Sequence, residues 1–176
     1  MVKLYVVDRY NRYRENHIVS LKTSKDITPI ELSHLAMALF PDSVSDQGNY
    51  YFLSNSPYVN PTINIDWSFE FYRRARHPDK PSSWQCLYAW QHLDEALSFR
   101  SSNGSPGDPI YEIDTDQRNC HIADMILLDN PDLALIHTYR AELYWQGKTM
   151  PNHLLKGWRT QWEVLVPLPL TVGRQI

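Results

Sequence analysis

An apolar run near the carboxyl end constrains the fold more than any other segment of this chain. It reads Gln161-Trp162-Glu163-Val164-Leu165-Val166-Pro167-Leu168-Pro169-Leu170, and residues 164–172 are rich in Val and Leu, which favours a buried or half-buried strand. Glu163 stands at the mouth of that strand and is the only acidic residue after Glu142. A carboxylate there is costly to desolvate unless it is paired or acts on a ligand. It is therefore either a solvated strand-end group or a functional one.

Length and composition fit one globular domain spanning residues 1–176. A chain of 176 residues buries a substantial core without disulfides. Its 43% hydrophobic and 21% charged residues are typical of globular proteins. No internal repeat or compositional break marks a second domain. The formal net charge of −3 argues against a general binder of nucleic-acid backbones.

Several common kinds of site are not predicted. Cys86 and Cys120 form no C-x-x-C pair and the histidines show no metal-ligand spacing, so no metal site is expected. The chain lacks glycine-rich dinucleotide and phosphate-loop motifs and the G-x-S-x-G elbow. It shows no signal peptide or membrane span. We therefore expect a cytoplasmic location, in the producing cell or in a target cell.

Local patterns predict an α+β arrangement. Residues 2–7 are β-prone, and Arg9 stands at the exit of this strand. The capping box Thr28-Pro29-Ile30-Glu31 and the apolar spacing after it predict a helix over residues 29–40. Further helices are expected at 65–76, 93–99 and 133–145, with Gly147 ending the last one. Strands are expected at 84–90 and 110–113, loops at 41–62 and 101–109, and a segment of uncertain type at 122–128.

Three scattered elements of the chain are considered together: Arg9 after the first strand, Ser82-Ser83 before a central strand, and Gln161-Trp162-Glu163 before a late strand. In this order they resemble the mono-ADP-ribosyltransferase superfamily, one branch of which has the same Q-x-E arrangement. A more diffuse similarity to small bacterial and phage proteins of this fold rests on short segments: Phe40-Pro41, Ser45, Gly48-Asn49-Tyr50, Pro78-Asp79-Lys80-Pro81-Ser82-Ser83, Ala123-Asp124-Met125, Tyr144-Trp145-x-Gly147 and Trp162-Glu163-Val164-Leu165.

The resemblance implies both a fold and a reaction. The fold would be a split mixed β-sheet around an NAD cleft, with helices at the periphery. The reaction would transfer ADP-ribose from NAD to a macromolecular acceptor and release nicotinamide, and protein is a better candidate acceptor than nucleic acid. Such small transferases commonly act as toxins, effectors or phage proteins that modify host machinery.

The expected chemistry assigns a role to each residue type. Cleavage of the bond between nicotinamide and ribose develops positive charge on the sugar. The resemblance implies that Glu163 hydrogen-bonds the ribose 2′-hydroxyl and stabilises that charge. Ser83 or Ser82 would hold the glutamate or the ribose through its hydroxyl. Arg9 would bind the pyrophosphate through its planar fork, with Arg12 or Arg14 as alternatives.

Gln161 and several aromatic residues complete the expected site. Gln161 lies two residues before Glu163, so both point to the same side of an extended segment. Glutamine in that position implies, within the superfamily, an acceptor other than arginine. An aromatic ring would stack on the nicotinamide, and four residues are candidates for it: Tyr50, Tyr51, Tyr88 and Trp84.

Two other functions stay open. A non-catalytic protein of the same fold would bind or inhibit a partner through the tyrosine-rich segment 41–62. An RNA-directed protein would use aromatic stacking together with the basic cluster Arg73-Arg74-Arg76-His77-Lys80, which is otherwise a solvated helix end.

Overall fold

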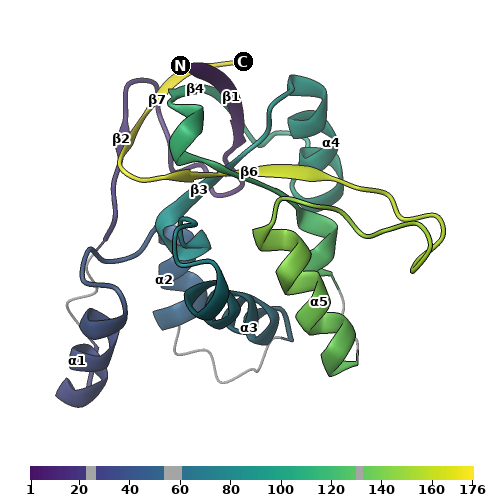
Figure 1. Ribbon diagram of the computed structural model, residues 1–176. Helices are drawn as coiled ribbons and strands as arrows, with labels where there is room; N and C mark the ends of the chain where they lie inside the picture. The colour runs from purple at the N-terminus through teal and green to yellow at the C-terminus, as the bar shows by residue number, and fades with distance from the viewer. Residues whose placement is uncertain (23–26, 54–60, 130–132) are drawn as a thin grey trace.

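A computed structural model describes residues 1–22, 27–53, 61–129 and 133–176, and within them shows an α+β protein with two sheets and five helices (Figure 1). The larger sheet has the strand order β1-β4-β7-β2 and the smaller one β3-β6-β5. The α+β class is confirmed. The expected mixture of parallel and antiparallel strands is wrong, because every strand pairing within these ranges is antiparallel. The helices connect strands of different sheets or strands of opposite direction, so no βαβ unit forms.

The larger sheet consists of β1 (Val2–Val7), β2 (Ile18–Val19), β4 (Ile110–Thr115) and β7 (Leu170–Gln175). The smaller sheet consists of β3 (Cys86–Ala89), β5 (His121–Asp124) and β6 (Trp162–Pro167). The helices are α1 (Ile30–Leu39), α2 (Asp46–Leu53), α3 (Pro61–Arg76), α4 (Leu93–Asn103) and α5 (Ala134–Trp145). Short 3₁₀ turns are η1 (Ser83–Gln85), η2 (Gln117–Asn119) and η3 (Met125–Leu128).

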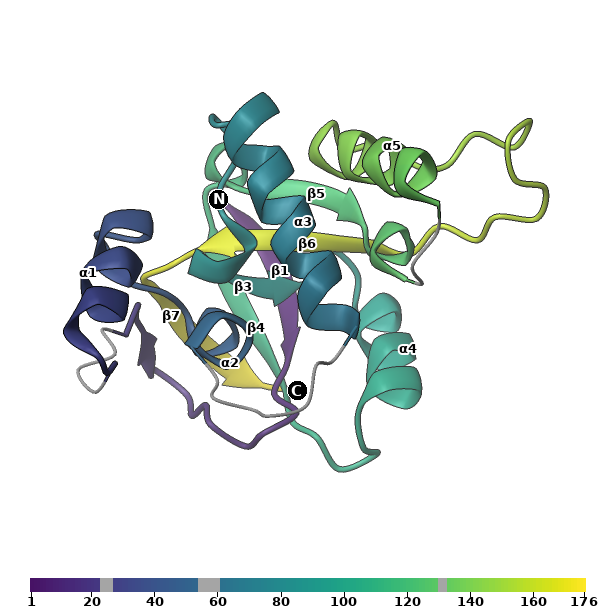
Figure 2. The ribbon, with the colours of Figure 1, turned by 90° about the horizontal axis from the view of Figure 1, so that it is seen from below.

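The smaller sheet is covered on both faces. Val164 and Val166 of β6 belong to a core cluster with residues of the larger sheet, whereas Leu165 packs with residues of α3 and α5. Successive strand residues point to opposite faces, so Glu163 lies on the same face as Leu165. Figure 2 shows α3 crossing this side of the sheet with α5 beside it. Burial on both faces explains why the run around β6 is apolar without alternation. The direction of successive side chains places Glu163 on the face that α3 and α5 cover.

The apolar run forms two strands instead of the single strand predicted over 164–172. Pro167 ends β6 and Pro169 precedes β7, and neither proline has an N–H to donate to a strand ladder. The chain therefore leaves the smaller sheet after β6 and joins the larger one as β7. The sheets are also linked at Tyr5 and Trp90, whose backbone N–H groups donate to each other's carbonyl oxygens at 2.9 and 2.8 Å.

Helix α1 lies within one residue of the predicted position at each end, but the expected cap is wrong. Thr28 does not cap it; Pro29 is the N-cap residue and makes no side-chain cap hydrogen bond. None of its residues is buried, and Leu32 and Leu35 are exposed. The helix projects from the rest of the molecule at the lower left of Figure 1.

The predicted loop over 41–62 is wrong in part, because α2 forms within it. The Ser45 hydroxyl accepts a hydrogen bond from the Gly48 N–H at 3.0 Å and so caps this helix. Gly48 lies against the backbone of Trp84, and a Cβ added there would be 2.2 Å from the Trp84 carbonyl oxygen. A tertiary contact therefore supports a helix that has no apolar period. Residues 54–60 of the segment lie outside the described residues.

The other elements differ from the prediction mainly at their ends. Helix α3 begins at Pro61, α4 extends into the predicted loop 101–109, and the strand expected from residue 84 begins at Cys86 after η1. The segment 122–128 divides into β5 and η3. The end of α5 is confirmed: Gly147 has φ +67°, and Lys148 N–H donates to the Leu143 carbonyl at 2.9 Å.

Replacing Gly48 by alanine is expected to destabilise the fold. The new methyl group would displace the Trp84 backbone, and overpacking of this kind costs about 1–3 kcal/mol. Gly107→Ala is the matched control, because a Cβ there meets nothing within 4 Å. Urea denaturation of both variants checks this. Equal stability of the two would contradict the close approach of α2 to Trp84.

Candidate functional site

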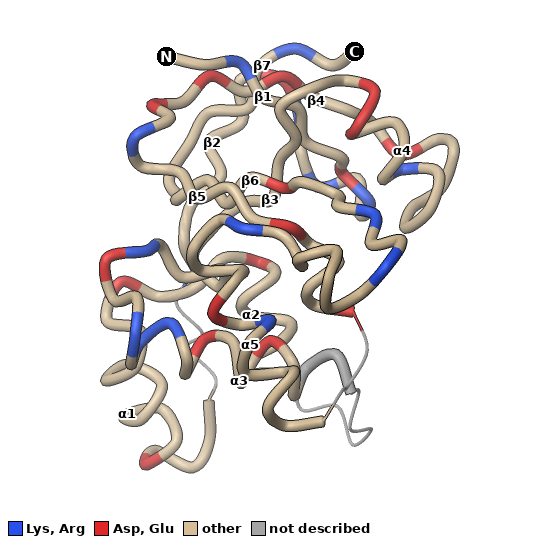
Figure 3. Tube along the Cα trace, turned by 45° about the vertical axis from the view of Figure 1, so that its right-hand side comes forward, with Lys and Arg blue, Asp and Glu red and all other residues tan. Residues whose placement is uncertain are grey.

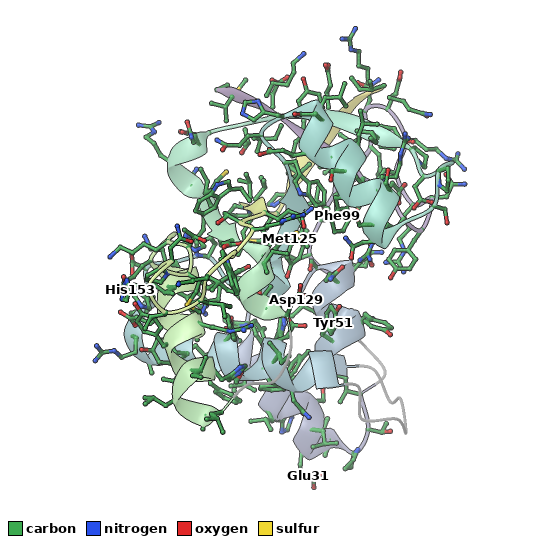
Figure 4. The ribbon with its side chains drawn as sticks, turned by 90° about the vertical axis from the view of Figure 1, so that its right-hand side faces the viewer. Glu31, Tyr51, Phe99, Met125, Asp129 and His153 are labelled. Atoms are coloured by element: carbon green, nitrogen blue, oxygen red, sulfur yellow. The ribbon has the colours of Figure 1, made fainter. Side chains whose placement is uncertain are left out.

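A cleft of about 400 Å³ opens on the helical side of the smaller sheet, a size within the usual range of ligand pockets. In Figure 4 the labels Tyr51, Phe99, Met125 and Asp129 mark its walls, whereas Glu31 and His153 lie at the periphery. The segments that line it come from the exit of β1, from α2, α3 and α4, from β3 and β6, and from the η3 region. Of the expected site residues, the cleft brings together Arg9, Tyr50, Tyr51, Tyr88 and Glu163, and it also includes Arg12, the alternative to Arg9.

Glu163 is deeper than the sequence indicates. It is the second residue of β6, pairs with Ala123 of β5 and is only 3% exposed. The Tyr144 hydroxyl of α5 donates to its Oε1 atom at 2.7 Å. Burial raises the pKa of Glu163 to about 8, the Tyr144 hydrogen bond opposes that rise, and nearby Asp66 adds to it. The interpretation as a solvated strand-end group is therefore wrong.

Asp66 of α3 is a cleft residue that sequence reasoning missed. Its side chain is 9% exposed, and no donor in the described parts of the chain hydrogen-bonds it. Burial raises its pKa to about 7. A signal was present in the predicted helix 65–76, because Asp66 lies three residues before Phe69, an apolar position of that helix, and so shares its face. An acidic residue on an apolar helix face needs an explanation.

The aromatic candidates divide between the cleft and the core. Tyr50, Tyr51 and Tyr88 line the cleft, and the rings of Tyr50 and Tyr51 meet edge to face with centroids 5.2 Å apart. Burial raises the pKa of Tyr51 to about 12 and holds that of Tyr88 well above its usual range. Trp84 is fully buried against Phe40 and Phe52, outside the cleft. It is therefore a core residue.

Two arginines provide positive charge at the cleft. The Arg9 guanidinium lies 5.4 Å from the Phe99 ring centroid, and its Nη1 donates to the Asn103 carbonyl at 3.3 Å. Arg12 lies 4.6 Å from the Tyr10 ring centroid and 3.8 Å from Asp46. Both line the cleft, whereas Arg14 does not. The structure thus retains Arg9 and Arg12 as anion-binding candidates.

Like Trp84 and Arg14, the expected site residues Ser82, Ser83 and Gln161 lie outside the cleft. The Ser82 hydroxyl donates to Glu70 at 2.9 Å, and Ser83 is buried in η1. The Gln161 backbone N–H donates to Asp124 at 3.0 Å, and its side chain is not among the cleft-lining groups. No hydrogen bond joins either serine to Glu163, and Ser82 faces α3 through Glu70. The hydroxyl that contacts Glu163 is that of Tyr144.

The basic cluster near residue 73 is partly internal. The buried Glu70 carboxylate accepts from Arg73 Nη2 at 2.7 Å and from Arg74 Nε at 2.8 Å. Arg73 also donates to the Lys80 carbonyl at 2.8 Å and Arg74 to the Leu39 carbonyl at 2.7 Å, so both guanidinium groups are engaged within the fold. Figure 3 shows basic and acidic residues interspersed over both the sheet and the helical parts. The described residues thus present less free positive charge at this helix end than the sequence indicates.

Asp124 holds the start of β6 in place. It is fully buried at the end of β5 and caps η3 through the Ile126 N–H. Its carboxylate also accepts from Gln161 N–H at 3.0 Å, from the Thr149 hydroxyl at 2.6 Å and from the Trp158 indole at 2.7 Å. The connector between α5 and β6 is thereby fixed, and with it the position of Glu163.

A comparison with protein-family profiles matches residues 5–172 to DUF2441, described as proteins of unknown function. The chain belongs to the DUF2441 family. No curated protein matches it. The DUF2441 match spans all of the cleft residues described above. Within the described ranges, no group of three or more His, Cys, Asp or Glu is placed to hold a metal ion, and no helix has the length and apolarity needed to cross a membrane.

The buried carboxyls are expected to make the protein less stable as the pH rises. Folding raises the pKa of Glu163 from 4.5 to about 8 and that of Asp66 from 3.8 to about 7. The folded protein therefore holds more protons than the unfolded chain between pH 4 and about pH 8, so the free energy of unfolding declines across that window and levels off above it.

The variants Glu163→Gln and Asp66→Asn imitate the protonated carboxyls and cannot ionise. Each is expected to flatten the decline, with its largest stabilisation above the folded pKa values. Urea denaturation at several pH values across the window measures the effect. Glu112→Gln is the control, because hydrogen bonds from Arg174 and Lys3 lower the pKa of Glu112. A decline as steep in both cleft variants as in the wild type would contradict the assignment.

Proposed function

We propose that this protein is an NAD-dependent mono-ADP-ribosyltransferase, that its two sheets form the split sheet of that fold, and that the cleft is its NAD site. The observation that carries the proposal is the buried Glu163 carboxyl inside a cleft that Arg9, Tyr50 and Tyr88 also line. These four residues come from distant parts of the sequence. The proposal assigns no ligand contact to Ser82, Ser83 or Gln161.

The charges of the cleft complement those of NAD. Arg9 and Arg12 suit the pyrophosphate, since a guanidinium binds phosphate oxygens in a planar fork. Asp129 and Glu163 suit the cationic nicotinamide ring and the positive charge that develops on its ribose. Tyr50, Tyr51 or Tyr88 would stack on the nicotinamide. The acceptor of ADP-ribose would be a macromolecule.

Glu163 would act as a carboxylate fixed beside the reacting sugar. Tyr144 occupies Oε1, which leaves Oε2 to accept a hydrogen bond from the ribose 2′-hydroxyl. The charge is useful because it is held in place before the reaction and is shielded from water, where electrostatic interactions are strongest. A bound nicotinamide cation would favour its ionised form, since an opposite charge lowers a carboxyl pKa.

Glu163→Gln is expected to lower ADP-ribose transfer by a factor of about 100 or more, on the scale of losing one preorganised transition-state contact. Glutamine keeps an oxygen for the Tyr144 hydroxyl, whereas alanine would leave that buried hydroxyl unpaired. Nicotinamide release from NAD and transfer of labelled ADP-ribose to lysate proteins measure the loss. Glu112→Gln, outside the cleft, should retain wild-type rates. Equal rates for the wild type and Glu163→Gln would rule out the assigned role.

The arginine variants decide which cation binds the pyrophosphate. Loss of Arg9 or Arg12 is expected to weaken NAD binding by about tenfold, the equivalent of about 1.4 kcal/mol, while Arg14→Ala leaves it unchanged. Isothermal titration calorimetry with NAD measures the three variants.

If the wild type neither binds NAD nor releases nicotinamide, the enzyme proposal fails. Partner binding through segment 41–62, where Tyr50 is 53% exposed, then becomes the better hypothesis.

A further inference from the structure

Asp66 is a deeply placed cleft carboxyl for which the proposed function provides no definite role. It is 9% exposed, reaches the cleft from α3, and receives no hydrogen bond from the described residues. Glu163, by comparison, has the Tyr144 hydroxyl, and the core carboxylates Glu70 and Asp124 are fully paired. Burying a carboxylate without a partner costs free energy. A ligand in the cleft is therefore the natural partner of Asp66.

The groups around Asp66 are acidic or hydroxyl-bearing. Burial is the main cause of the raised pKa values of four titratable groups, and the negative charge of Asp66 adds to each of them. The four come from different elements: Tyr51 of α2, Tyr88 of β3, Tyr144 of α5 and Glu163 of β6. The positive charge of Arg9 lowers the pKa of Tyr51. The Arg9 guanidinium lies against the Phe99 ring and donates to the Asn103 carbonyl. Asp66 itself forms no ion pair with a described Lys, Arg or His. It therefore keeps the capacity to accept a proton.

We propose that Asp66 is the general base of the transfer reaction and that the acceptor is a hydroxyl-bearing group; this rests on the proposed function. In the step, the C1′–N bond of the nicotinamide riboside unit breaks, and its electron pair leaves with nicotinamide. The acceptor oxygen forms the new bond to C1′. The hydroxyl proton passes to a carboxylate oxygen of Asp66 and from there to solvent.

The charges of the cleft disfavour an acidic acceptor, and a general base is needed only for an acceptor that must lose a proton. A carboxylate acceptor would enter beside Asp66, Asp129 and Glu163, where like charges repel, and it has no proton to lose. A hydroxyl is uncharged and must lose a proton when it attacks. General bases work best when their pKa lies near the working pH, and burial raises the pKa of Asp66 to about 7.

Asp66→Asn tests the role, with Asp66→Glu as the conservative partner. Asparagine keeps the shape and removes a buried charge, so the variant should fold. We expect unchanged NAD affinity by calorimetry, a fall in kcat for transfer of about 100-fold or more, and partial recovery in Asp66→Glu. A raised KM for NAD with an unchanged kcat would show that Asp66 only holds NAD, and would overturn the proposal.

The pH profile provides a readout that a structural role would not change. If Glu163 and Asp66 must both be ionised, log(kcat/KM) of the wild type rises with a slope approaching two below about pH 7. In Asp66→Asn one ionisation is missing, and the slope falls to one. A slope that is the same in both proteins would overturn the proposal.

Mass spectrometry of the modified product identifies the acceptor atom. ADP-ribose attached to serine, threonine, tyrosine or sugar hydroxyls supports the proposal, whereas attachment to a carboxylate or a guanidinium overturns it. The two proposals fail in different ways. Wild-type protein that neither binds nor cleaves NAD refutes both, whereas active wild type with an equally active Asp66→Asn refutes only the role of Asp66.

Discussion

The burial of β6 is the constraint on which the rest of the structure depends. This strand is hydrogen-bonded along both edges, to β3 and to β5, and is covered on one face by the larger sheet and on the other by α3 and α5. A side chain at position 163 therefore reaches ligand only through the cleft. The same packing that stabilises the core also removes water from the carboxyl and raises its pKa. The residues that form the core around β6 therefore also set the environment of the Glu163 carboxyl.

The buried carboxyls of this half of the molecule fall into two kinds. Asp124 and Glu70 each accept several hydrogen bonds and tie segments together, Asp124 fixing the connector before β6 and Glu70 joining α3 to Ser82. Glu163 has one donor, and Asp66 has none among the described residues. Buried polar groups normally have hydrogen-bond partners. Carboxyls that line a cleft and have few partners are therefore candidates for contacts with a ligand.

The sequence predicts what depends on local chemistry. The first strand, the position of α1 and the end of α5 at Gly147 all follow from short patterns. Arg9, Tyr50, Tyr88 and Glu163, which the sequence places in one site, line the same cleft. Helix α2 was missed because the contact of Gly48 with Trp84 joins residues far apart in the chain. Ser82 was misplaced for the same reason, since its partner Glu70 lies on another element. Asp66 sits in a predicted helix, but no local pattern shows what that helix faces.

The unfavourable free energy of ionising the cleft carboxyls in the empty protein can be recovered when a ligand binds. Two carboxyls with too few donors destabilise the folded protein once they ionise, because the interior does not replace the water they lose. A ligand that brings a cation or a hydroxyl restores those interactions, so it binds the ionised protein more tightly than the protonated one and releases protons as it binds. Affinity for such a ligand and the instability of the empty fold at high pH therefore have one physical origin. If side chains of the protein itself provided hydrogen bonds to these carboxyls, the empty protein would be more stable and a ligand would gain less free energy by binding.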